Sequence, residues 1–138
     1  CIAFIVSATI CSKRSSPMPD MTNADSSKLL CLYVDVNGTL IQSQGSNPQA
    51  NGELVSKIIK WKSEGALLYC WSSRGAGYAQ GVVRRLGIED CFSAFLCKPH
   101  VLIDDQAVND WSCLVHLYPP QIGNHTVDSL TRMIDDEN

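Results

Sequence analysis

The stretch CLYVDVNGTLI, residues 31–41, joins an apolar run to an abrupt polar turn. The run already begins at the preceding Lys-Leu-Leu, and its length and near-continuous apolar character are typical of a strand covered on both faces. It ends on Asp35, an amide follows at Asn37, and Gly38 and Thr39 break the pattern. Because ligands gather at the carboxyl ends of parallel strands, the carboxylate at this tip is a candidate site residue.

The rest of the chain alternates strand-length apolar runs with segments of helical periodicity. We expect strands at ALLYCW, FSAFLC and HVLID (residues 66–71, 92–97 and 100–104), helices over residues 53–64 and 78–86, and a polar loop over 42–52. CLVHLY (113–118) is a further strand candidate, and TVDSLTRMI (126–134) indicates a closing helix. This alternation predicts an α/β fold, a parallel sheet with helices on both faces in a three-layer, Rossmann-like arrangement.

Length and composition allow one domain. The chain has 138 residues, of which 45% are hydrophobic, so a single core of ordinary size is expected over residues 28–138. Residues 1–27 combine an apolar run too short to span a bilayer with a linker rich in Ser, Pro, Asp and Asn. We expect them to lie outside the core, as a leader or as sequence missing from the mature protein; a signal or anchor remnant is the alternative.

Charge and cysteine usage argue against several classes of function. A net charge of -3 gives no basic field for phosphate contacts, which argues against a nucleic-acid partner. The seven cysteines are odd in number and show no C-x-x-C spacing, so buried thiols in a reducing, cytoplasmic compartment fit better than a disulfide framework or a zinc site. For the core we expect no membrane partner.

Polar residues end the four predicted strands. These are Asp35, Ser72, Lys98 and the pair Asp104-Asp105. At a shared sheet edge, a carboxylate can attack a phosphoryl group, and clustered carboxylates can bind Mg²⁺. A lysine offsets the negative charge, and a hydroxyl can hold a phosphoryl oxygen. The set therefore has the parts of a phosphoryl-transfer site.

These segments, in this order, resemble the motifs of the haloacid dehalogenase-like hydrolases. LYVDVNGTL is similar to the first motif, a strand followed by Asp-x-Asp-Gly-Thr, and LLYCWSSRG is similar to the second, a strand ending in Ser or Thr. CKPHVLIDDQ resembles the lysine and the acidic pair of the third and fourth motifs. The resemblance covers residues 29 to 111 and is nearest to compact phosphatases that act on sugar phosphates.

The resemblance implies a role for each matching residue. Asp35 would be the nucleophile and, with the backbone carbonyl of Asn37, a magnesium ligand. Asp104 and Asp105 would complete the metal site. The resemblance further implies that Ser72 binds the transferring phosphoryl group, with Ser73 nearly as good a candidate, and that Lys98 orients the nucleophile. Gly38, Thr39 and Arg74 belong to the same implied substrate-binding set.

Asn37 departs from the pattern. In the family's phosphatases this position holds the aspartate that protonates the leaving alcohol and then activates water, and an amide can do neither. We therefore expect a magnesium-dependent phosphatase with an aspartyl-phosphate intermediate, or a catalytically weak protein on the same core that binds metal and a phosphorylated ligand. The interval between Leu40 and Trp71 is filled by the predicted loop and helix, and that between Arg74 and Lys98 by a helix and a strand, so we expect no cap domain. The open site would take a large substrate or be closed by a neighbouring subunit in a homo-oligomer.

Three other interpretations are weaker. Phospho-accepting receiver domains use the same residue types, but their acidic pair lies on the first strand, whereas here it comes last. RGAGYAQG lacks the G-x-G-x-x-G spacing of a dinucleotide site. The second Ile-Asp-Asp, ending in Asp135 and Asp136, has no strand before it and indicates a solvated terminal segment.

Overall fold

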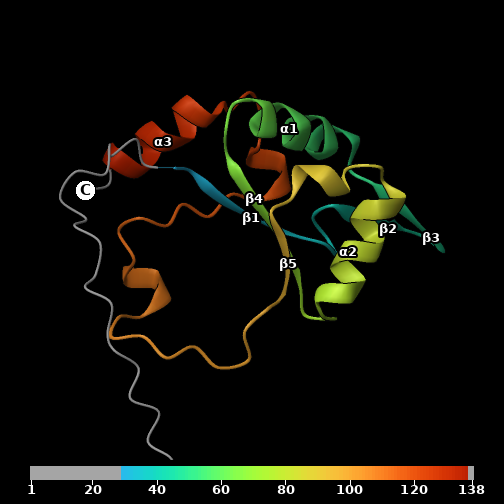
Figure 1. Cartoon of the computed structure of the whole chain (residues 1–138), viewed down its shortest axis with the longest axis horizontal. Coiled ribbons are helices and arrows are strands. Elements are labelled where there is room, and N and C mark those ends of the chain that lie inside the picture. The colour runs from blue at the N-terminus through green and yellow to red at the C-terminus, as the bar shows by residue number, and fades with distance from the viewer. Residues whose placement is uncertain (1–28, 137–138) are drawn as a thin grey trace, which may run out of the picture.

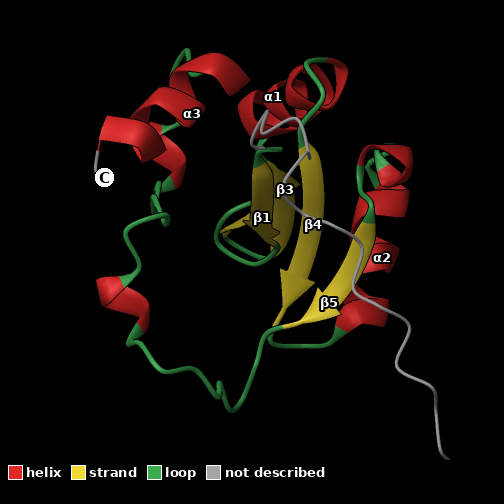
Figure 2. Cartoon of the chain, turned by 60° about the vertical axis from the view of Figure 1, so that its left-hand side comes forward, coloured by secondary structure: helices red, strands yellow, loops and turns green. Residues whose placement is uncertain are grey.

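The computed structural model describes residues 29–136 (Figure 1). The predicted leader, residues 1–27, lies outside the described residues. The main elements run along the chain as β1 (Cys31–Asp35), β2 (Ile41–Gln44), β3 (Asn47–Ala50), α1 (Gly52–Ser63), β4 (Leu67–Ser72), α2 (Ala76–Arg85), β5 (Ala94–Cys97) and α3 (Val127–Asp136). β1, β4 and β5 form a parallel sheet with β4 in the middle, which confirms the α/β class (Figure 2).

The strand register brings the carboxyl ends of the sheet to one edge. Asp35 at the end of β1 lies opposite Trp71, and Ser72 at the end of β4 lies opposite Cys97. The three strands of this sheet therefore finish at nearly the same level, so the residues that follow them are neighbours.

Side chains alternate between a sealed and a partly open face of this sheet. Leu68 and Cys70 are fully buried. The rings of Tyr33, Tyr69 and Trp71 gather on the other face, with the Tyr33 ring centroid 5.0 Å from each of the other two. Tyr33 remains exposed, so the described residues cover this second face only in part.

Helix α1 follows the predicted boundaries closely. Asn51 caps its amino end, because its Oδ1 accepts a hydrogen bond from the backbone N–H of Leu54 at 3.2 Å. Leu54, Ile58 and Trp61 form its buried stripe. The helix stops before Gly65, whose φ of 92° is the left-handed conformation expected of a glycine that ends a helix.

The closing helix is confirmed as α3, and it packs on the end of α1. Trp61 Nε1 donates to the carbonyl of His125 at 2.9 Å, and the N–H of Val127 donates to Glu64 Oε2 at 2.8 Å. Leu130 is buried in the common core. The last part of the chain is therefore tied to the first helix. Within residues 29–136, no helix is both long enough and apolar enough to span a membrane.

The predicted loop at residues 42–52 is instead a hairpin of β2 and β3. Gln44 and Asn47 are partners in the ladder, so Gly45 and Ser46 form a two-residue turn, and Gly45 has a φ of 67°. Tight hairpin turns require a positive φ that glycine adopts without strain. The polar composition hid the hairpin, because both of its strands lie at the surface and carry no apolar alternation.

The strands predicted at residues 100–104 and 113–118 are wrong. After β5 the chain leaves the sheet in a wide excursion that contains only short helical turns before α3 (Figures 1 and 2). Val101 and Ile103 are 78% and 95% exposed. An apolar run becomes a strand only when an edge pairs with it, and no described strand lies beside these residues or along the outer edge of β1.

Two neighbouring isoleucines in α1 test the core. Ile58 is 0% exposed and Ile59 is 51% exposed. We expect Ile58→Ala to lower the free energy of unfolding by about 2–5 kcal/mol, because it leaves a cavity. Ile59→Ala should change it by about 0.5 kcal/mol or less. Urea denaturation followed by circular dichroism measures both, and equal losses would contradict the orientation of α1.

Candidate functional site

Asp35 lies at the sheet edge between a cation and a hydroxyl. Lys98 Nζ lies 2.9 Å from Asp35 Oδ1, and Thr39 Oγ1 donates to Asp35 Oδ2 at 3.3 Å. The carboxylate is half-buried. It is therefore held in a fixed orientation, with one oxygen on an ammonium group and the other on a weaker neutral donor.

The turn after β1 brings Thr39 back to this carboxylate. The backbone N–H groups of Leu40 and Ile41 both donate to the carbonyl of Val36 at 2.9 Å. Gly38 has a φ of 83°, a conformation that other residues rarely adopt, which explains the glycine at this point of the turn. The Asn-Gly-Thr sequence thus folds as the predicted sharp exit from the strand.

Lys98 is positioned by the pairing of β4 with β5. Its backbone N–H donates to the carbonyl of Ser72 at 3.1 Å, which continues the strand ladder by one residue. Its ammonium lies 5.8 Å from the centroid of the Trp71 ring. The structure therefore brings Lys98 and Asp35 together across the end of β4, as the order of the motifs predicted.

Ser72 and Ser73 differ in accessibility. Ser72 is 1% exposed, and its Oγ accepts a hydrogen bond from the N–H of Arg74 at 3.1 Å, so it holds the turn that leads into α2. Ser73 is exposed at the same strand end. The accessible hydroxyl here is therefore that of Ser73, the second candidate of the sequence analysis.

Asn37 is bound to a residue that the sequence analysis did not place in the site. The hydroxyl of Tyr78 donates to Asn37 Oδ1 at 2.9 Å, and the guanidinium carbon of Arg74 lies 4.1 Å from the centroid of the Tyr78 ring. The sequence indicates only that Tyr78 begins the predicted helix over residues 78–86. Its contact with Asn37 joins the turn after β1 to helix α2, which is far away in the sequence, and no local signal indicates it.

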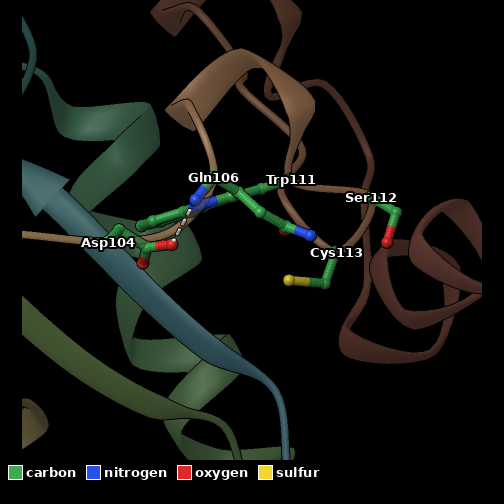
Figure 3. A pocket seen from close by; sticks show the side chains of 5 residues that line it. All are labelled: Asp104, Gln106, Trp111, Ser112 and Cys113. Atoms are coloured by element: carbon green, nitrogen blue, oxygen red, sulfur yellow. Dashed lines mark hydrogen bonds between the residues drawn. The ribbon is translucent and has the colours of Figure 1, made fainter.

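The acidic pair is not gathered at this edge. Asp104 and Asp105 are exposed residues of the excursion that follows β5. Asp104 Oδ1 accepts from the N–H of Gln106 at 2.9 Å, and its side chain lines an open pocket of about 320 Å³ (Figure 3). The other lining residues are Gln106, Trp111, Ser112 and Cys113. The expectation that all four predicted strand ends converge is therefore wrong for the fourth, because that strand does not form.

The predicted magnesium ligands do not form a close group in the described part of the chain. Within residues 29–136, no group of three or more His, Cys, Asp or Glu side chains is close enough to hold a metal ion. Asp35 has both oxygens engaged, one with Lys98 and one with Thr39. The residue types suit Mg²⁺, but the acidic pair and Asp35 would have to approach each other to bind it.

The thiol next to the candidate nucleophile is inert. Burial, and secondly the negative charge of Asp35, raise the pKa of Cys70 from 9.0 to about 12. Because the thiolate is the reactive form, Cys70 is a packing residue at neutral pH.

Comparisons with protein-family models, with curated proteins and with solved structures each gave no match to this chain.

Thiol labelling tests the environment of Cys70. At about pH 8, iodoacetamide should modify the exposed Cys97 in the native protein and leave Cys70 unmodified, because the raised pKa keeps Cys70 protonated. Mass spectrometry of peptides reads both sites. Equal rates at the two cysteines would contradict the burial of Cys70.

The same thiol makes stability depend on alkaline pH. The pKa of Cys70 is about 12 in the folded protein and 9.0 in the unfolded chain, so the folded protein binds more protons between these two pH values. The contribution of Cys70 to stability is therefore fully present below pH 9 and is lost as the pH rises toward 12. Each pH unit in this window should cost up to about 1.4 kcal/mol. We expect the free energy of unfolding to fall less steeply with pH in Cys70→Ala than in the wild type, as measured by urea denaturation at increasing pH. The same dependence on pH in both proteins would contradict the raised pKa of Cys70.

Proposed function

We propose that this protein is a phosphoric-ester hydrolase of the haloacid dehalogenase-like type, with Asp35 as its nucleophile and a small phosphate ester, such as a sugar phosphate, as its substrate. The observation that carries the proposal is the placement of Asp35 at the carboxyl edge of the parallel sheet, with Lys98 at 2.9 Å. The uncapped, three-layer α/β/α form of this fold belongs to the proposal. The central parallel sheet and its helices support it.

The reaction proceeds in two steps through Asp35. In the first, a carboxylate oxygen attacks phosphorus, the bond from phosphorus to the ester oxygen breaks, and the leaving alkoxide takes a proton from solvent. In the second, water attacks phosphorus of the acyl phosphate, which releases inorganic phosphate and restores the carboxylate. One water is consumed per ester cleaved. Oδ2 is the oxygen better placed to attack, because it is held only by the Thr39 hydroxyl, whereas Oδ1 is paired with Lys98.

Positive groups around Asp35 offset the charge of the reacting phosphoryl group. Lys98 is in direct contact with the nucleophile, and the turn of Ser73 and Arg74 leads from the same sheet edge into α2. The first amides of a helix have no partners within the helix and favour anions. Preorganised donors of this kind stabilise the transition state of phosphoryl transfer.

Asn37 makes both steps slow. An amide held by the Tyr78 hydroxyl cannot donate a proton to the leaving group or remove one from water. This contact favours a second candidate function, in which the same core holds a phosphorylated ligand and turns it over weakly. The two functions differ in the rate of hydrolysis and share the same residues.

We include magnesium in the proposal because the predicted ligands are of the types that bind it. The ligands would be Asp35, the carbonyl of Asn37 and the pair Asp104-Asp105. Since the pair lies in the excursion after β5, none of the steps above depends on the metal.

Turnover tests the role of Asp35 and the consequence of Asn37. Purified protein should hydrolyse members of a panel of phosphate esters slowly, and Asp35→Asn should abolish this activity. Asn37→Asp should raise the rate by about 100-fold to 10,000-fold, because it restores an acid-base group. Release of inorganic phosphate measures all three.

Asp90→Asn is the matched control, because Asp90 is an exposed carboxylate of the α2–β5 connection. Its activity should equal that of the wild type. An Asp35→Asn variant as active as the wild type would contradict the nucleophile. A wild type indistinguishable from buffer, with an active Asn37→Asp variant, would favour the binding function.

The chain offers its own control for the metal. Asp104→Asn combined with Asp105→Asn should abolish the binding heat of Mg²⁺ in isothermal titration calorimetry. The same change at the second Ile-Asp-Asp, Asp135 and Asp136, should leave it unchanged. If both double variants bind Mg²⁺ as the wild type does, the acidic pair is not a ligand.

A further inference from the structure

A groove of about 440 Å³ lies beside the candidate site, between α2 and the hairpin of β2 and β3. Figure 1 shows these elements next to each other. Asn37 is one of the residues that line the groove. The groove therefore begins at a residue only two positions after Asp35 in the sequence. This volume is within the range of sites for small organic ligands.

The charge of the groove comes from two arginines. Four arginines lie among the described residues, and two of them, Arg84 and Arg132, are paired with the carboxylates of Glu89 and Asp128. The other two, Arg74 and Arg85, have no carboxylate partner in the described part of the chain, and both line the groove. No Asp or Glu is among the lining residues. On a chain with a net charge of -3, this groove is a local positive region.

Contacts with neighbouring groups hold the guanidinium groups of Arg74 and Arg85 at different places along the groove. Arg74 stacks on the Tyr78 ring, and the Tyr78 hydroxyl donates to Asn37, so this guanidinium lies at the end of the groove that Asn37 lines. Arg85 is the last residue of α2, and its Nε donates to the carbonyl of Gly81 at 3.2 Å. The ten residues of α2 rise about 15 Å, so the helix separates the backbones of the two arginines by roughly that length.

An apolar wall lies between the two charges. It includes Val82 and Leu86 from α2, and Ile41, Pro48 and Ala50 from the hairpin. Val82 is buried, and Leu86 and Ile41 are partly buried. A ligand that fits this surface carries negative charge at both ends and less polar atoms in between.

We propose that this groove binds the leaving group of the substrate, and that the substrate is a phosphate ester with a second anionic group at its far end. The reacting phosphoryl group lies between Asp35 and Arg74, the body of the substrate contacts Val82 and Leu86, and Arg85 binds the second anion. The inference rests on the proposed function for the identity of the reacting end. Arg85 is the residue that determines specificity.

A matched pair of ligands tests the second anion. Hexanediol bisphosphate and hexanediol monophosphate differ only in a terminal phosphate, and their affinities for the Asp35→Asn variant, which blocks turnover, can be measured by calorimetry. We expect the bisphosphate to bind at least about tenfold more tightly, because a guanidinium contact with phosphate is a charge-assisted hydrogen bond. Adding Arg85→Gln should remove this preference and leave the affinity for the monophosphate unchanged.

Arg84→Gln in the same background is the control, since Arg84 is the neighbouring arginine, is paired with Glu89 and does not line the groove. It should keep the preference. Equal affinities of the two ligands, loss of preference in both arginine variants, or no binding of either ligand would overturn the groove proposal. These are binding results, so they are distinct from a failure of the proposed hydrolysis, which would appear as absent turnover in the protein with Asp35 intact.

Discussion

The ion pair between Asp35 and Lys98 joins the two edge strands of the sheet across the end of the central one. Two strand spacings separate the backbones of β1 and β5, about 10 Å, so only a long side chain can make this contact. The hydrogen bond from the Lys98 N–H to the Ser72 carbonyl fixes the position of the Lys98 backbone relative to the end of β4. Because the pair is partly exposed, it contributes only about 0–1 kcal/mol to stability. Its main effect is to orient one carboxylate.

The core and the first three parts of the site could be predicted because they depend on local patterns. Near-continuous apolar runs gave β1, β4 and β5, and helical spacing with a terminal glycine gave α1 and α2. Parallel strands then place Asp35, Ser72 and Lys98 at one edge whatever the details of packing. The sequence did not separate Ser72 from Ser73, because the choice depends on the Arg74 N–H that occupies the Ser72 hydroxyl.

The remaining features depend on contacts between distant segments. Residues 100–104 have the composition of a strand, but pairing needs a neighbouring edge, and in the described fold these residues lie outside the sheet. Asp104 bonds its own loop instead of the sheet edge. Two features arise only when α2 meets the turn after β1 and the hairpin in space: the hydrogen bond from Tyr78 to Asn37, and the groove. The residues next to Asp35 could therefore be predicted, whereas the groove that would select a substrate could not.

Asn37 links the proposed chemistry to this surface. It lies between Asp35 and the groove, and its amide is bonded to the same tyrosine on which Arg74 stacks. An amide at this position removes an acid-base carboxylate from the end of the site where the leaving group would lie. The proposed acyl phosphate on Asp35 should consequently decay slowly, which makes it observable.

Trapping the acyl phosphate is the most direct test of whether Asp35 is the nucleophile. The protein is incubated with acetyl phosphate, reduced with borohydride and digested, and the peptide that contains position 35 is sequenced by mass spectrometry. The account predicts homoserine in place of Asp35, in higher yield from the wild type than from Asn37→Asp, where water attack is faster. Reduction at another acidic residue, or none at position 35 while phosphate is released, would contradict it.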